Sequence, residues 1–216
     1  KISSEIRSYH YKNTLAWNDD GLRLIPTQQY MEYNSNLMAL KSKFNQYADE
    51  FCKNYPDYIN EAKVRLNGMF NEKEYPDVNS IRTKFNVKIG FEPVPDVSDF
   101  RVDLQENEIN KIKSELEDSL NTRQENAVKD LVLRMKELVE KVVERLSNKD
   151  NKFKDSLITN ITDFVKIIPK LNFTNNQYIN DLADEIKQLC KNPDTLRKYN
   201  SIRAETNTKA NEILDK

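Results

Sequence analysis

The residues with the clearest potential for chemistry are two adjacent carboxylates, Asp19 and Asp20, in the stretch NDDG. Carboxylates bind divalent cations. The acidic residue that would complete a Mg²⁺ site with them is Asp96, Asp99 or Asp103. The same four letters are ordinary turn composition, because Asn and Asp bond to nearby backbone and Gly21 accepts a positive φ. We favour a structural turn anchored by Trp17, whose carboxylates accept hydrogen bonds from backbone N–H groups, with no metal or other cofactor.

Histidine, cysteine and glycine are too few for the common catalytic arrangements. The chain has one histidine, His10, and two isolated cysteines, Cys52 and Cys190. Zinc sites and Ser-His-Asp triads need more such groups at a definable place. Three glycines form neither a phosphate-binding loop nor a dinucleotide fingerprint. We therefore expect no enzyme and no catalytic residue, a surface or half-buried histidine, and free thiols in a reducing cytosol.

Composition points to long helices in a chain without a strong charge bias. Of 216 residues, 32% are charged and 38% hydrophobic, and only 3 are Gly. The 34 basic and 35 acidic residues give a net charge of −1, so a global basic footprint for nucleic acid is lacking. No apolar run is long enough for a membrane span. We expect a cytoplasmic chain that does not bind membranes.

Two long segments carry helical periodicity. From Thr27 to Met69, apolar residues alternate at spacings of three and four, which is a heptad pattern. Its members are Tyr30, Tyr33, Leu37, Leu40, Phe44, Tyr47 and Phe51. From Gln105 to Leu146, part of the stripe recurs every eleven residues, which predicts a nearly straight seam. Pro56 is expected to kink or restart the first helix. Two segments of equal length separated by a compact insert predict an antiparallel coiled-coil hairpin.

The insert and the ends complete a mainly α fold. Within residues 70–104, Val87, Ile89 and Phe91 alternate like a strand, as does the later stretch FRVDL, so we expect a small β-element at the hairpin tip. Three short amphipathic helices after residue 148 are expected to form a bundle at the hairpin base. The expected domains are an N-terminal segment with its turn (1–26), the hairpin (27–148) and the C-terminal bundle (149–216).

Three blocks of the sequence carry a family resemblance. They are TLAWNDDGLRLIPTQQYMEY, FEPVPDVSDFRVDL and FKDSLITNITDFVKIIPKLNFT. Together they resemble an uncharacterised family of tailed phages and some bacteria, although Ala16 stands where the family pattern has proline. Genes of that family often lie near those for MoxR-type AAA ATPases and von Willebrand factor A proteins. The resemblance implies an accessory role in such an assembly, in the cytosol of the host, and brings no catalytic residue with it.

These observations favour a non-catalytic adaptor that binds a protein, such as an AAA ATPase or another phage or host protein. The expected contact surface is the insert, because so short a segment cannot bury all its apolar side chains. Its residues are Phe85, Phe91, Pro93, Pro95, Phe100 and Arg101. The alternative is a nucleic-acid-associated phage factor that acts on DNA or on host defence complexes through a local basic face. A metal-dependent nuclease using the aspartates is the least favoured reading.

Overall fold

The chain is mainly α-helical and divides into two compact units. The computed structural model describes residues 1–96, 106–148 and 150–216. Unit 1 consists of Lys1–His10 and Glu32–Val94, and unit 2 of Tyr11–Met31 and Pro95–Lys216. The division differs from the three consecutive parts expected from the sequence, because the two long helices fall largely in different units.

A short β-hairpin opens unit 2 and contains the predicted turn. Strand β1 (Leu15–Ala16) pairs antiparallel with β2 (Arg23–Leu24). Gly21 lies at φ 86°, in the left-handed region that glycine adopts without strain. Asn18 closes the turn, because its side-chain oxygen accepts a hydrogen bond from the Leu22 N–H at 3.0 Å. Trp17 is buried in the core of the unit, so the predicted anchor is confirmed.

The prediction for the two aspartates of this turn was wrong. The side chains of Asp19 and Asp20 are exposed, and neither makes a hydrogen bond to any residue that the structure describes. The neighbouring Asn18 takes the backbone-bonding role instead, because its amide oxygen reaches the Leu22 N–H across the turn.

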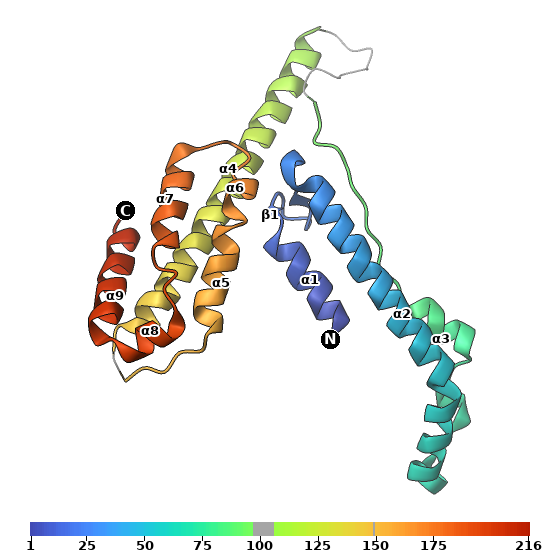
Figure 1. Cartoon of the computed structure of the whole chain (residues 1–216). Helices are drawn as coiled ribbons and strands as arrows, with labels where there is room; N and C mark the ends of the chain where they lie inside the picture. Colours follow the sequence, from blue (N-terminus) through green and yellow to red (C-terminus); the bar gives the residue numbers. More distant parts are fainter. Residues whose placement is uncertain (97–105, 149) are drawn as a thin grey trace. The chain divides into compact units, whose positions relative to one another are not determined.

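The rest of unit 2 is a helical bundle built on one long helix (Figure 1). Helix α4 (Glu106–Leu146) buries one face of its C-terminal half. The helices after it are α5 (Ser156–Val165), α6 (Ile168–Leu171), α7 (Gln177–Lys187), α8 (Pro193–Lys198) and α9 (Asn200–Leu214). Asn176 and Asn192 cap α7 and α8 by accepting hydrogen bonds from backbone N–H groups. The helical character expected for this region is therefore confirmed, although residues 150–216 form five helices where three were expected.

The apolar stripe of α4 does not form the predicted coiled-coil seam with residues 27–69. Leu131, Met135 and Val142 are buried in a cluster with side chains of α5 to α9 and of the β-hairpin. Helix α9 is the principal neighbour of α4, followed by β1. Within the described residues, this cluster contains no member of the 27–69 segment. The apolar faces of the shorter helices cover the stripe, so that both surfaces are removed from water.

Unit 1 is organised along the second long helix, α2 (Thr27–Leu66), which runs through Pro56 without a break. It also contains most of α1 (Ile2–Lys12) and all of α3 (Val78–Lys84). Two short 3₁₀ turns, Asn67–Met69 and Glu72–Glu74, join α2 to α3. Asp77 caps α3, and its hydrogen bonds, first that from the Ser80 hydroxyl, lower the pKa of its carboxyl below the usual value.

The predicted β-element of the insert is not found in the residues described. Residues 85–96 form neither helix nor strand, and FRVDL lies outside the described residues. Instead, the chain after α3 runs beside α2 (Figure 1). Phe85 meets Phe51 edge-on at a centroid distance of 5.4 Å, and Phe91 meets Tyr33 at 6.4 Å. The aromatic contacts to α2 therefore take the place of strand pairing.

Two further findings concern predictions made from composition. Cys52 and Cys190 are free, as predicted. Across residues 1–96, 106–148 and 150–216, no helix combines the length and apolar character needed to cross a membrane.

Candidate partner-binding groove

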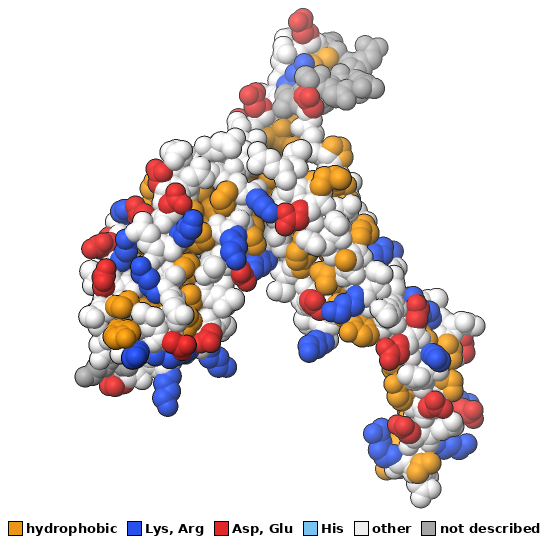
Figure 2. All heavy atoms as spheres, in the orientation of Figure 1, with side chains coloured by type: hydrophobic (Ala, Val, Ile, Leu, Met, Phe, Trp, Pro, Cys, Tyr) orange, Lys and Arg blue, Asp and Glu red, His pale blue; other side chains and the backbone are white. Residues whose placement is uncertain are grey.

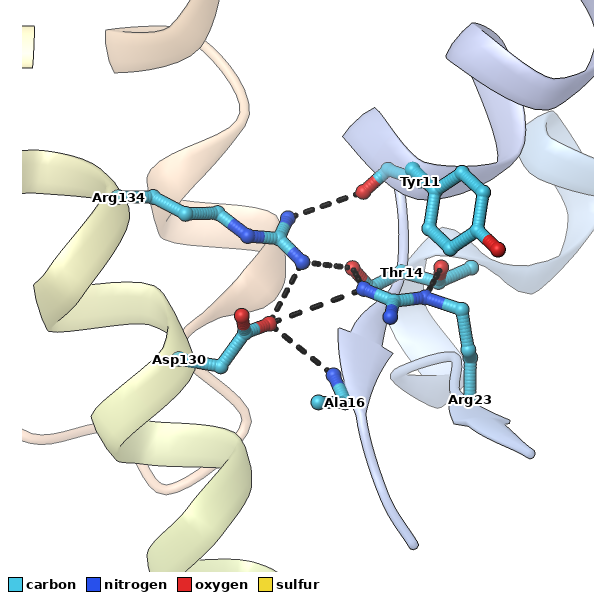
Figure 3. Close-up of polar contacts among 6 residues, drawn as sticks. All are labelled: Tyr11, Thr14, Ala16, Arg23, Asp130 and Arg134. Carbon is cyan, nitrogen blue, oxygen red and sulfur yellow. Dashed lines mark hydrogen bonds and ion pairs between the residues drawn. The ribbon is translucent and has the colours of Figure 1, made fainter. Parts of the chain in front are cut away.

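The β-hairpin that contains the predicted turn is fixed to α4 by a network of charged side chains (Figure 3). The Asp130 carboxylate accepts hydrogen bonds from the Ala16 N–H at 3.0 Å and from Arg134 at 2.6 Å. Arg134 also donates to the carbonyls of Tyr11 and Thr14. Arg23 lies 3.7 Å from the same carboxylate oxygen. Because each group has a protein partner, this network is best explained as a structural corner.

Among the aspartates considered for a metal site, those that the structure describes do not form a metal-binding cluster. Asp99 and Asp103 lie outside the described residues, and Asp19 and Asp20 are exposed on the turn. Within the part of the chain that the structure describes, no group of three or more His, Cys, Asp or Glu residues is arranged to hold a metal ion.

His10 is half-buried, and its Nδ1 lies 2.7 Å from the Tyr33 hydroxyl in unit 1.

The strongest candidate site is a groove in unit 1 with a volume of about 770 Å³. Its floor is one face of α2, formed by Phe44, Tyr47, Ala48 and Phe51 at helical spacings of three, one and three. The three aromatic side chains belong to the predicted heptad pattern, and Ala48 does not. Phe44 and Phe51 are only half-buried, and Tyr47 is 50% exposed. Figure 2 shows hydrophobic side chains at the surface along α2, interspersed with charged ones.

The two walls of the groove come from distant parts of the sequence. One wall is α1, which contributes Ile2 and Ile6 from successive turns, and the other is the stretch Lys84–Lys88. Glu5 of α1 pairs with Lys43 of α2 at 3.6 Å beside the first wall. Local sequence patterns do not predict this arrangement, because they do not show which helix faces will form one site.

Arg82 positions the second wall. Its guanidinium donates to Asp49 of α2 at 2.7 Å and to the Phe85 carbonyl at 3.0 Å. The first contact fixes α3 against α2, and the second fixes the direction in which the chain leaves α3. The edge-on contact between the Phe85 and Phe51 rings packs the start of this wall on α2.

The charged residues that line the groove are all basic. Its lining includes Arg7, Lys84 and Lys88 and no acidic residue. None of these three cations pairs with a carboxylate in the described residues, whereas the nearby Glu5 and Asp49 are already paired. All three side chains are exposed. The groove therefore combines an apolar floor with free positive charge at its edge.

The residues predicted as a contact surface are only partly in the groove. Phe85 lines it. Phe91 contacts Tyr33 of α2 beyond that lining and stays 40% exposed, while Pro93 and Pro95 are exposed, with Pro95 assigned to unit 2. Phe100 and Arg101 lie outside the described residues. Sequence analysis did not predict the walls formed by α1 and by Lys84–Lys88. It also expected the α2 floor to be buried in the coiled-coil seam.

Comparisons of this chain with protein-family models, with curated proteins and with solved structures found no match.

Proposed function

We propose that the chain is a non-catalytic helical adaptor that binds a partner protein through the groove of unit 1. The observation that carries this proposal is the incompletely covered apolar floor, formed by Phe44, Tyr47 and Phe51. Exposed apolar surface that gathers in a concave site is characteristic of binding sites, because a partner's side chains can displace water from it.

The biological setting is also part of the proposal. A phage-encoded accessory role in an AAA ATPase assembly rests on the resemblance of the three sequence blocks alone. An adaptor function requires only an exposed apolar site on a folded unit. The groove therefore supports this general function even if the partner belongs to another assembly.

The test is a quantitative capture experiment with two matched variants. Tyr47→Arg places a charge in the groove, and Tyr178→Arg makes the same change on α7 of unit 2; both tyrosines are 50% exposed, so both variants are expected to fold. Each tagged full chain is incubated with lysate of phage-infected bacteria, and bound proteins are quantified by mass spectrometry.

We expect at least one protein to be retained by the wild type and by Tyr178→Arg but reduced about tenfold or more with Tyr47→Arg, a change of roughly 1.4 kcal/mol. Direct titration of that purified protein against the three chains must reproduce the difference. Identical capture by all three chains would show that the groove is not the binding site.

A further inference from the structure

One wall of the groove has backbone groups that are not used within the chain. Residues Asn86–Gly90 form no hydrogen bond, through backbone or side chain, to any residue in the described ranges. Backbone N–H and C=O groups normally find partners, and the groups of this segment are left to solvent. An unpaired row of such groups is what the edge of a β-sheet offers to an added strand.

The geometry of the segment suits strand addition. Phe85 contacts Phe51, and Phe91 contacts Tyr33, which lies eighteen residues earlier on the same helix. Eighteen residues of helix span about 27 Å between these two contact points on α2. The six residues from Phe85 to Phe91 reach only about 20 Å even when fully extended. The segment must therefore be nearly extended, and the aromatic side chains span the remaining distance.

The side chains of the segment alternate as in a strand that is covered on one face. Val87 and Ile89 are half-buried, while Asn86, Lys88 and Gly90 are exposed. The strand signal read from NVKIGF thus corresponds to a real extended backbone that lacks only a pairing partner within the described residues. Packing on α2 supplies the rigidity that an isolated strand does not have.

Charge decides which peptide fits best. Asn86, Val87 and Lys88 line the groove, so a strand added along this wall would lie over its apolar floor. Such a strand would pass the unpaired cations Arg7, Lys84 and Lys88. Alternate side chains of a strand point to opposite faces, so apolar residues can face the floor while acidic residues between them face the cations.

We propose that the groove binds an extended acidic segment of the partner, which adds as a β-strand to Asn86–Gly90. This inference rests on the proposed adaptor function and specifies its ligand. Backbone hydrogen bonds to the wall supply affinity, and the apolar floor together with the three cations supplies specificity.

The experiment selects ligands from a displayed library of random twelve-residue peptides, with the full chain as bait. Clones that also bind Tyr47→Arg are removed, so that the remaining peptides depend on the groove. The selected peptides are synthesised, and their affinities are measured by fluorescence anisotropy. We expect alternating apolar and acidic residues in the selected sequences.

Two sets of variants then test the binding mode. Lys88→Glu is expected to weaken binding at least tenfold. Lys129→Glu changes an exposed lysine of α4 that has no ion pair within the described residues, and it is expected to leave binding unchanged. N-methylation of alternate peptide amides removes the donors along one edge of a strand. One alternate set is expected to abolish binding while the other is tolerated, and amide exchange at Asn86–Gly90 is expected to slow on binding.

The outcomes separate the inference from the function on which it rests. If no peptide binds in a manner that depends on Tyr47, both the adaptor function of this groove and the strand proposal are overturned. If groove-dependent peptides are found but show helical spacing, lack acidic residues or tolerate both N-methylated sets, the groove binds a partner and strand addition is wrong.

Discussion

At the scale of single residues, Arg203 has the largest structural role that the sequence did not reveal. Its side chain lies on α9 with only 5% of the residue exposed. It donates hydrogen bonds to the carbonyls of Arg145, Leu146, Asn148 and Asn151. The last carbonyls of a helix have no partner within the helix, and a cation at that end also complements the helix dipole. Arg203 thus ties α9 to the C-terminal end of α4.

We predict that Arg203→Met destabilises unit 2 by about 2–3 kcal/mol, because the methionine fills space but cannot donate to the four carbonyls that the buried guanidinium satisfies. Chemical denaturation followed by the fluorescence of Trp17, the sole tryptophan, reports on this unit. The matched control is Arg145→Met on the exposed surface of α4, expected to change stability by about 0.5 kcal/mol or less. Equal effects of the two variants would refute the role given to Arg203.

At the scale of elements, Asp130 fixes the β-hairpin on α4. A two-residue ladder such as β1–β2 is too short to hold its own position. Asp130 compensates by accepting from the Ala16 N–H and by orienting Arg134, which binds the chain ahead of β1 (Figure 3). The burial of Leu15 and Trp17 in the core of unit 2 then completes the attachment.

The second prediction is that Asp130→Ala loosens this attachment and lowers the free energy of unfolding of unit 2 by about 1–2 kcal/mol. The value is below that of a fully buried charged hydrogen bond, because solvent partly screens the carboxylate. Asp118→Ala, at an exposed position just over three turns earlier on α4, serves as the control. A Trp17 emission spectrum and denaturation midpoint that are the same for both variants would contradict the assignment.

At the scale of the whole molecule, the chain divides into two compact units, each with packed side chains of its own. Leu131 and Trp17 belong to the same buried cluster in unit 2. Phe51 belongs to unit 1, where it contacts Phe85 and Tyr55. A side chain affects the stability of the core in which it is packed, so mutations in the two units should have distinguishable effects.

We therefore predict that Leu131→Ala and Phe51→Ala act on different transitions. Leu131→Ala removes a fully buried side chain and should lower the stability reported by Trp17 by about 2–5 kcal/mol. Phe51→Ala should leave that transition within about 0.5 kcal/mol of wild type while reducing the thermal stability of helix seen by circular dichroism. A comparable shift of the Trp17 transition by both variants would indicate a single cooperative unit.

The sequence by itself determined the helices and the turn. Both long helices, the short C-terminal helices and the NDDG turn were predicted close to their observed positions. These features follow from local causes: the period of apolar residues along a helix, capping side chains, and the tolerance of Gly21 for positive φ. The alternation of Val87, Ile89 and Phe91 likewise predicted extended backbone, though not its lack of a paired strand.

Only the tertiary structure decided which surfaces meet. The stripes on residues 27–69 and 105–146 have equal length, so pairing them was a reasonable inference, yet α9 and β1 pack on α4. A pattern of apolar residues shows that a face will be buried, but hydrophobic burial is non-directional and does not specify the partner. For the same reason, the groove could not be predicted from the sequence, because its floor on α2 and its walls on α1 and Lys84–Lys88 are distant from one another along the chain.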